Sequence, residues 1–464
     1  MIGFGSIGKA TLPLIKRHIK QAPEVAITII SPDDSNRNVA EQYGAHFIQK
    51  AVTEENYEEI IGSLLGDRNK LAYIINIANE VGSKELVEFA ALNNALYIDT
   101  VVEPWPGLYF NTEISKSEQS NYHFRHSLHE LKPTHKTTPT AISCCGANPG
   151  MVSWLVKEAL LNLAADLGHT TNKPTTQTEW ATLMQELGVK GVHIAERDTQ
   201  TNGKERPKDV FVNTWSAEGC MAECLQPAEL GWGTHEQELP SDGHTHQEGS
   251  GAAIYLDTFG GEVEVQTWTP TAGAHKGFLV THNEAISIAD YFTVRDGDDV
   301  VFRPTCHYAY HPSDATVESL HELFIERNAG AQEEVHILTE DEIVSGADEL
   351  GVLLYGHDKG AYWYGSRLSI EETRTLAPHQ NATALQVSSA ILAGMFYAIN
   401  HPTEGLIETD EMDHEECLAI QKPYLGKVFG AYTDWKPSIN GTDTGAPDPW
   451  QFKNIRINKP NVRN

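Results

Sequence analysis

The sequence predicts an α/β protein: a doubly wound parallel sheet at the N-terminus, then a second α+β domain built on a mixed, mainly antiparallel sheet. Three observations support this prediction. A glycine-rich turn opens the chain, strand-like and helix-like segments alternate up to about residue 147, and after Pro149 the chain becomes rich in Thr, Trp, Gly and His. Alternation of strands with helices is typical of parallel sheets.

The glycine-rich turn is Gly3-Phe4-Gly5-Ser6-Ile7-Gly8, a G-x-G-x-x-G pattern that runs into a predicted helix. The first glycine allows a tight turn, the second lets backbone N–H groups approach a pyrophosphate, and the third lets the helix pack on the first strand. The helix N-terminus then faces the phosphates. We therefore expect a Rossmann-type dinucleotide site that includes Gly3, Gly5, Ser6, Ile7 and Gly8.

Acidic residues follow the second predicted strand, at 25–30. Asp33 and Asp34 lie just beyond it, where a carboxylate would hold the ribose hydroxyls, and no arginine follows before Arg37. This pattern favours NAD over NADP.

The first strand is short in this sequence. Only Met1 and Ile2 precede Gly3, whereas a buried strand usually takes about five residues. We expect part of this strand to be missing.

The other elements of the first domain continue the alternation. Strands are predicted at 71–77, 95–98 and 140–143, with helices at 38–43 and 84–93. The strand at 71–77 ends in small and polar residues, where the ligand crevice of such a sheet opens, so Asn76 and Ala78 are expected to contact the cofactor. The predicted NAD-binding domain spans residues 1–147.

The second predicted domain spans residues 148–377 and binds the substrate. Its helices are expected at 151–166 and 179–187, and its strands at 192–195, 209–216, 252–256, 262–270 and 277–281. The segment 231–251 is expected to be a loop. The helix at 381–400, within a return at 378–425, is expected to pack on the first domain, and the tail at 436–464 to be loop-like.

The chain is strongly acidic, with 34 Lys+Arg against 64 Asp+Glu and a formal net charge of −30 over 464 residues. A negative field repels nucleic acid and anionic membranes and raises the local concentration of cationic ligands. Ordinary acidic solubility explains the charge equally well, so the charge alone does not identify a substrate.

Six cysteines are too few and too irregularly spaced for a disulfide framework. Neither the cysteines nor the histidines show zinc-like spacing, so no metal site is expected. The N-terminus lacks a signal-peptide pattern, and no stretch reaches about 18 uninterrupted apolar residues. We expect a cytoplasmic protein without a membrane partner.

Asn148 lies in Gly146-Ala147-Asn148-Pro149-Gly150, between a strand and a helix at the domain junction. An asparagine there can hydrogen-bond a nicotinamide carboxamide or a substrate amine. The alternative is an Asn-Pro-Gly turn with a purely structural role.

Trp215 is predicted to lie in a strand, with Glu223 eight residues beyond it. Tryptophan is usually a core residue, but the neighbouring acids suggest that the indole face meets an ammonium group in a cation–π contact. Glu196 ends another predicted strand and is expected to face the same space, unless Arg197 neutralises it.

Two more segments carry candidate residues. Trp232 and Glu236 lie in a six-residue stretch with His235, which is more chemistry than a surface loop needs. His282 closes the predicted strand at 277–281, a position suited to a proton shuttle near neutral pH. A lone histidine is more often a hydrogen-bonded structural residue.

These motifs together resemble the bacterial, NAD-dependent homospermidine synthases, relatives of the saccharopine dehydrogenases, over nearly the whole chain. The segments that carry the resemblance are 3–8, 146–153, 211–219, 227–236, 268–282, 304–312, 342–356 and 432–435.

The resemblance implies a homodimer, formed through the second domain, that holds NAD tightly and makes homospermidine from two putrescines, or from putrescine and spermidine. On the family pattern Trp215 supplies the cation–π contact, and Asn148, Glu223 and His282 line the reaction centre. Glu196, Glu103 and Asp348 hold ammonium groups.

The chemistry of such a reaction agrees with these residue types. Hydride abstraction from a carbon that bears an amine needs the nitrogen lone pair, so a nearby base must first deprotonate the ammonium. A saccharopine- or carboxynorspermidine-type reductase would instead need Arg or Lys for a substrate carboxylate. A non-enzymatic NAD-binding sensor is the remaining alternative.

Overall fold

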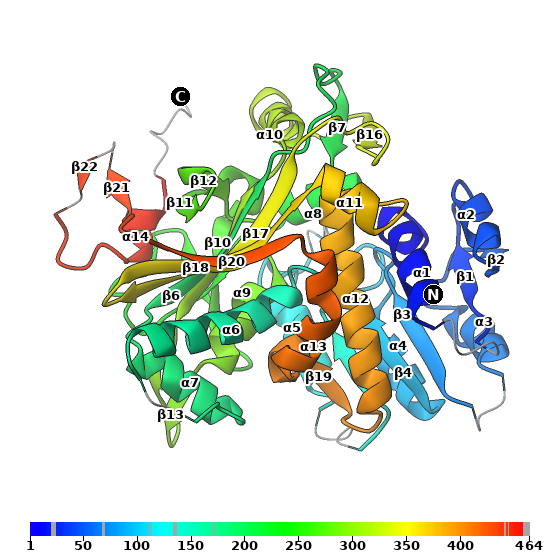
Figure 1. Ribbon diagram of the computed structural model, residues 1–464, viewed down its shortest axis with the longest axis horizontal. Coiled ribbons are helices and arrows are strands. Elements are labelled where there is room, and N and C mark those ends of the chain that lie inside the picture. Colours follow the sequence, from blue (N-terminus) through cyan, green and yellow to red (C-terminus); the bar gives the residue numbers. More distant parts are fainter. Residues whose placement is uncertain are drawn as a thin grey trace.

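The computed structural model describes residues 1–19, 25–66, 70–109, 111, 113–132, 137–169, 172–439, 442–443 and 445–457. It consists of a nucleotide-type α/β domain and a second domain on a large mixed sheet (Figure 1). This is the predicted fold class.

The first domain contains a parallel sheet in the order β2-β1-(residues 1–3)-β3-β4-β5-β19. Its strands are β1 (Thr28–Ser31), β2 (His46–Gln49), β3 (Ala72–Asn76), β4 (Ala95–Asp99), β5 (Ala141–Ser143) and β19 (Leu406–Glu408). Its helices are α1 (Ser6–His18), α2 (Arg37–Gln42), α3 (Tyr57–Leu64), α4 (Ser83–Leu92) and α5 (Asn121–His129).

Ile2 occupies the place of the first strand. It bridges Ile30 on one side and Asn76 on the other, and its N–H donates to the Ile75 carbonyl at 2.8 Å. Although only two residues precede Gly3, the strand position next to the glycine turn is therefore filled and hydrogen-bonded to both neighbours.

The second domain has a ten-stranded sheet whose main path is β20-β18-β17-β6-β15-β8-β10-β9, with the β11–β12 hairpin joined to β15. All pairings are antiparallel except that of β15 with β6. The strands are β6 (Gly191–Asp198), β8 (Pro227–Gly231), β9 (Gly243–Thr245), β10 (Ala253–Phe259), β11 (Glu264–Thr269), β12 (Gly273–Phe278), β15 (Thr305–His311), β17 (Ala347–His357), β18 (Gly360–Ser369) and β20 (Lys427–Thr433).

Helices cover one face of this sheet, where α6 packs on β17 and β18 and α9 packs on β8 and β15. The helices of this part are α6 (Met151–Asp166), α7 (Gln177–Glu186), α8 (Ala217–Cys224), α9 (Asn283–Tyr291), α10 (Asp314–His321) and α11 (Ile370–Leu376), with a π-helical turn η2 (Glu322–Glu326) and a 3-10 turn η1 (Gly260–Glu262). The β11–β12 hairpin packs against β6, β15 and β17, and α14 (Phe452–Ile455) packs against β11. Smaller sheets pair β7 (Val210–Asn213) with β16 (Glu334–Ile337), β13 (Val294–Asp296) with β14 (Asp299–Phe302), and β21 (Ser438–Ile439) with β22 (Thr442–Asp443).

Helix α12 (Ala382–Asn400) lies between the domains and packs against α1, β4 and α13 (His414–Gln421) (Figure 1). It is long and apolar enough to cross a membrane by length and composition, but 83% of its apolar window is buried. It therefore serves as a core helix. The turns η3 (Thr409–Glu411) and η4 (Lys422–Tyr424) flank α13.

Some elements differ from the sequence predictions. The expected loop at 231–251 contains β9, and the expected loop-like tail contains β21, β22 and α14. Short strands and a four-residue helix have too little periodicity to be recognised, because their formation depends on tertiary contacts. Residues 440, 441, 444 and 458–464 of the tail lie outside the described residues.

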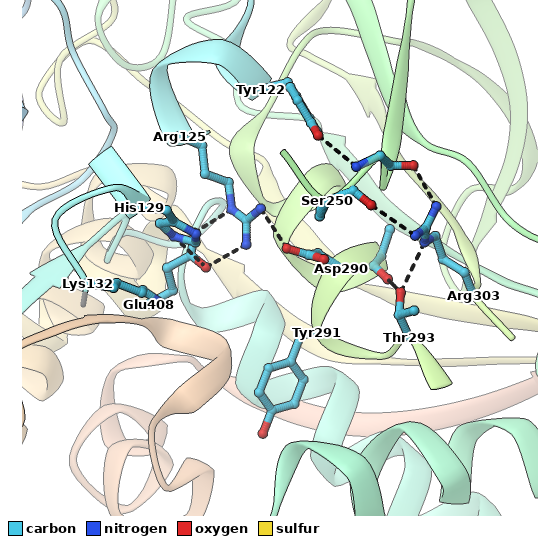
Figure 2. Close-up of polar contacts among 12 residues, drawn as sticks. Tyr122, Arg125, His129, Lys132, Ser250, Asp290, Tyr291, Thr293, Arg303 and Glu408 are labelled. Carbon is cyan, nitrogen blue, oxygen red and sulfur yellow. Dashed lines mark hydrogen bonds and ion pairs between the residues drawn. The ribbon is translucent and has the colours of Figure 1, made fainter. Parts of the chain in front are cut away.

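A buried ion-pair network joins the domains (Figure 2). Arg125 on α5 donates to both carboxylate oxygens of Glu408 at 2.7 and 2.8 Å and to Asp290 on α9 at 2.9 Å. The Arg125 and Glu408 side chains are only 7% and 8% exposed. Burial alone would raise the pKa of Glu408, but Arg125 and His129 hold it well below its usual value. Since α9 begins directly after His282, this network fixes a site-bearing helix to the first domain.

Replacement of Glu408 by Gln should destabilise the protein, because it leaves the buried Arg125 with one carboxylate instead of two. Loss of one partner from a buried pair costs about 3 kcal/mol or more. Denaturant unfolding of Glu408→Gln measures this loss. The matched control is Glu130→Gln, which breaks the exposed Lys84–Glu130 pair at 3.3 Å and should cost less than about 1 kcal/mol. Equal losses in the two variants would show that the network does not hold the domains.

Candidate functional site

The glycine turn has the geometry that a dinucleotide site needs. Gly3 has φ +88, and a Cβ on it would come within 2.9 Å of the Ala78 backbone nitrogen. A Cβ on Gly8 would lie 2.9 Å from the Gly3 carbonyl oxygen, so this glycine allows close packing of α1. Gly5 faces open space, and the first turn of α1, which starts at Ser6, has neither an acidic residue nor a side-chain cap. The free N–H groups of this turn can bind an anion.

The other predicted cofactor residues lie at the carboxyl ends of β1 and β3. Asp33 is exposed, and its carboxylate accepts hydrogen bonds from the N–H and hydroxyl of Ser35 at 3.0 and 2.6 Å. These bonds lower its pKa. Buried Asn76 donates to the Val81 carbonyl at 3.1 Å and accepts from the Ala78 N–H at 3.4 Å, so its amide shapes the loop after β3.

Asn148 lies at the junction of the two domains, and its contact with a nicotinamide carboxamide or a substrate amine stays a prediction. It lies in a tight turn that has a cis Asn148–Pro149 peptide and a bridge between Gly146 and Gly150. At the same time its side-chain amide donates to Glu196 Oε2 at 3.1 Å. The domain junction is thus hydrogen-bonded to the second domain at the site.

Three buried carboxyl groups meet on β6 and β17. Glu196 and Asp198 share one face of β6 because side chains alternate along a strand, and Asp348 pairs with Asp198 in the register of β17. Burial raises the pKa of Glu196 to about 7, and the nearby Asp198 carboxylate adds to this effect. Burial and the charges of Glu196 and Asp198 raise the pKa of Asp348 well above its usual value.

Each of these carboxyls has hydroxyl or amide partners. Asp198 accepts from the Thr214 hydroxyl at 2.7 Å, and Asp348 accepts from the Thr383 hydroxyl at 2.6 Å. Asp348 Oδ1 has no partner among the described residues. Arg197 does not neutralise Glu196, because it points to the opposite face of β6 and pairs with Asp314 at 3.0 Å.

Trp215 lies outside the strand in which it was predicted. Strand β7 ends at Asn213, and Trp215 directly precedes Ser216, the N-cap of α8. Ser216 accepts the Gly219 N–H and so starts a helix where the strand propensity of the segment suggested continuation. The indole is half-buried, and its Nε1–H donates to the Tyr310 hydroxyl at 3.1 Å.

His282 also differs from its prediction, because β12 ends at Phe278 and His282 is the N-cap of α9. Its Nε2 lies 3.1 Å from Glu223 on α8, and its Nδ1 lies 3.2 Å from Glu284. Burial lowers the pKa of His282, but the two carboxylates raise it well above its usual value. The two carboxylates therefore favour the protonated imidazolium form of His282.

Glu103 follows β4 and lies near Glu223. It accepts the Tyr109 hydroxyl at 2.9 Å. Burial raises its pKa to about 8, and the charges of Glu223 and Glu80 contribute to this rise. Glu103 and Glu80 of the first domain thus form a second group of acids with Glu223, which contacts His282.

The structure does not bring Trp232 and Glu236 to these residues. Glu236 accepts the Thr305 hydroxyl at 2.8 Å and the Phe452 N–H at 2.9 Å, and the Trp232 ring lies 6.1 Å from that of Phe452. Thr305 is at the opposite end of β15 from Tyr310. Trp232 and Glu236 thus contact the C-terminal segment around Phe452. A sequence pattern cannot distinguish such a structural contact from a ligand-binding role.

Sequence reasoning missed several residues that lie against the predicted ones: Asp198, Glu284, Tyr308 and Tyr310. Alternation was an available signal for some of them. Glu196 and Asp198 are two apart in one strand, as are Tyr308 and Tyr310, so each pair must share a face.

Comparison with known proteins first defines the class. The family model described as the saccharopine dehydrogenase NADP binding domain matches residues 1–142, and that of the saccharopine dehydrogenase C-terminal domain matches residues 146–431. The second match begins at Gly146, the first residue of the turn that carries Asn148.

Individual relatives are more specific. The homospermidine synthase of Blastochloris viridis is 54% identical over 463 residues, which cover 98% of this chain and 96% of the relative. That of Mesorhizobium japonicum (strain LMG 29417 / CECT 9101 / MAFF 303099) is 52% identical over 466 residues, with the same coverage. The crystal structure of the Legionella pneumophila homospermidine synthase in complex with NAD matches with a TM-score of 0.90 and 42% identity, over 99% of this chain and 97% of that one. The chain belongs to the homospermidine synthase family.

Replacement of Trp215 tests its role directly. If the indole face binds a substrate ammonium, Trp215→Ala loses about 2 kcal/mol of cation–π binding, which lowers kcat/KM at least about thirtyfold. Trp215→Phe and Trp215→Tyr should keep graded fractions. The half-buried Trp435, whose ring lies 5.9 Å from that of Trp450, provides the control variant Trp435→Ala, which should keep most activity. An active but destabilised Trp215→Ala would mean that Trp215 is only a core residue.

Proposed function

We propose that this protein condenses two putrescines to homospermidine with release of ammonia, or putrescine and spermidine with release of 1,3-diaminopropane. The observation that carries the proposal is the set of buried carboxyls around Trp215 and His282. No lysine or arginine in the described part of the chain forms an ion pair with Glu196, Asp348, Glu103 or Glu223. The activity named for the relatives supports the same conclusion.

The same carboxyls favour this reaction over the two alternatives, a reductase and a non-enzymatic sensor. A saccharopine- or carboxynorspermidine-type reductase needs a cation to bind the substrate carboxylate. A site of carboxyls, an amide and an indole instead fits ammonium groups. A non-enzymatic NAD-binding sensor needs no hydrogen-bonded base and acid pair such as Glu223 and His282.

The glycine turn and the uncapped first turn of α1 fit a dinucleotide, so NAD is the cofactor in this proposal. The backbone N–H groups of residues 5–8 would hold its pyrophosphate. Asp33, whose carboxylate is ionised and exposed, would face the ribose and disfavour a 2′-phosphate. When bound, NAD would supply hydride transfer from and back to the amine carbon.

The protein residues supply the proton transfers. Oxidation requires the substrate nitrogen to lose its proton first. Two carboxylates favour the protonated form of His282, so the Glu223 carboxylate accepts that proton, and His282 donates one to the amino group that leaves as ammonia. The attacking amine loses a proton in the same way, and Glu223 passes protons to His282 across their 3.1 Å contact, so that both return to the products, ammonium and the secondary amine. Trp215 and the Glu196 cluster hold the substrate cations, and burial of these groups keeps water away from the imine.

The finer assignments follow from the family resemblance and are part of the proposal. They are the enzyme class, a transferase of alkyl groups other than methyl, together with a cytoplasmic location and a homodimer. All six cysteines are free and buried, which agrees with a reducing compartment.

Product formation with NAD far below the putrescine concentration tests the proposal. Two putrescine dications give one homospermidine trication and one ammonium ion, so the reaction consumes neither redox equivalents nor protons overall. We expect homospermidine and ammonia in equal amounts, without accumulation of NADH, when polyamines, ammonia and NADH absorbance are measured together. One NADH per ammonia would instead identify an amine dehydrogenase.

A further inference from the structure

Strand β15 carries two tyrosines on one face, directly beneath the site. Tyr308 and Tyr310 are two residues apart, so their side chains point the same way. Their rings stack with centroids 5.0 Å apart and planes 12° apart. They are only 3% and 2% exposed. Strand β15 lies inside the ten-stranded sheet between β6 and β8, which gives the pair a rigid base.

Each hydroxyl meets a different predicted site residue. The Tyr308 hydroxyl donates to Glu196 Oε2 at 2.5 Å. The Tyr310 hydroxyl accepts the indole N–H of Trp215 at 3.1 Å. The Tyr308 ring also lies 4.4 Å from the imidazole of His282. Two neighbouring side chains of one strand therefore contact three residues that come from β6, α9 and the segment before α8.

These hydroxyls do more than fill space. A phenylalanine would pack equally well, and a buried hydroxyl costs free energy unless it is hydrogen-bonded. An indole has only one donor, so the bond to Tyr310 restricts rotation of the Trp215 ring. The orientation of the ring face decides whether a cation can lie over it.

We propose that Tyr308 and Tyr310 are positioning residues: Tyr310 sets the plane of the Trp215 indole, and Tyr308 orients the Glu196 carboxylate and favours its ionised form. This inference rests on the proposed function, because it assigns the two tyrosines to the binding of the same ammonium groups.

The Tyr308 contact has a consequence for pH dependence. The groups that face Glu196 are Asp198 on its own strand, Asp348 on β17, Tyr308 and Tyr310 on β15, Cys220 on α8, Asn148 at the domain junction and His282 directly before α9. Burial raises the pKa of Glu196 to about 7, whereas the bond from Tyr308 lowers it. Loss of that bond therefore raises the pKa of Glu196 further. As the pH falls, the ionised carboxylate is then lost at a higher pH than in the wild-type protein.

The experiment compares Tyr308→Phe, Tyr310→Phe and Tyr355→Phe in the full-length protein. Tyr355 is the matched control, because it is fully buried in β17 of the same sheet and its hydroxyl has no partner in the described structure. Three measurements are made: kinetics that give kcat and KM for putrescine across a range of pH, the melting temperature, and the ¹⁹F spectrum of 5-fluorotryptophan-labelled protein. The chain has nine tryptophans, and Trp215→Phe identifies the Trp215 signal.

Tyr310→Phe should move the Trp215 fluorine signal and lower kcat/KM about tenfold, the effect of one lost hydrogen bond. Tyr308→Phe should leave that signal in place and shift the acid limb of kcat/KM to higher pH by about half a unit or more. Tyr355→Phe should change neither.

An unmoved Trp215 signal in Tyr310→Phe, or an unmoved acid limb in Tyr308→Phe, would overturn the corresponding half of the proposal. Equal effects in Tyr355→Phe would reduce both tyrosines to packing residues. The fluorine measurement needs no turnover. If the wild-type protein did not convert putrescine, the proposed function would fail while the Tyr310 contact could still be judged.

Discussion

The site depends on one physical constraint, the free-energy cost of burying carboxyl groups that have no lysine or arginine beside them. Taking a carboxylate out of water is costly unless a cation pairs with it or a proton neutralises it. The fold uses both solutions. Glu408 is paired with Arg125 and stays ionised, whereas the pKa of Glu196 rises to about 7 and that of Glu103 to about 8. A carboxyl with a raised pKa, such as Glu196 or Glu103, can exchange its proton for a substrate ammonium. Glu408 cannot, because it is already ionised and paired with Arg125.

The arrangement of the domains brings these groups together. The loop after β4 of the first domain places Glu103 near Glu223 of the second, the loop after β3 contacts Ser216 through Asn79, and Asn148 links the junction to Glu196. The residues that make these contacts lie on or beside well-anchored elements, α9 and β15. Arg125 fixes α9 to the first domain (Figure 2), and β15 lies within the largest sheet. Such a frame suits a reaction in which an imine must stay in place between oxidation and reduction.

The sequence predicted the parts of this account that depend on local pattern. The glycine turn, the parallel sheet and helix α6 follow from spacing and periodicity. Residue type and position indicated Asn148, Glu196, Trp215, Glu223 and His282, whereas Glu103 and Asp348 came from the family resemblance alone. Trp215 and His282 were assigned to strands, because hydrogen bonds that cap a helix, such as that of Ser216, are not visible as hydrophobic alternation. Trp232 and Glu236 show the opposite limit. Their residue types suit ligand binding, but only the tertiary fold reveals that they contact residues 448–455.

The most direct test of the central claim is proton release when putrescine binds. Calorimetry in buffers of different ionisation enthalpy measures it, with the protein loaded with NADH so that the donor amine cannot be oxidised. If buried, protonated carboxyls exchange protons for substrate ammonium groups, binding near neutral pH should release about one proton or more per site. Glu196→Gln should release fewer protons. Binding of putrescine by the wild-type protein without proton release would contradict the account.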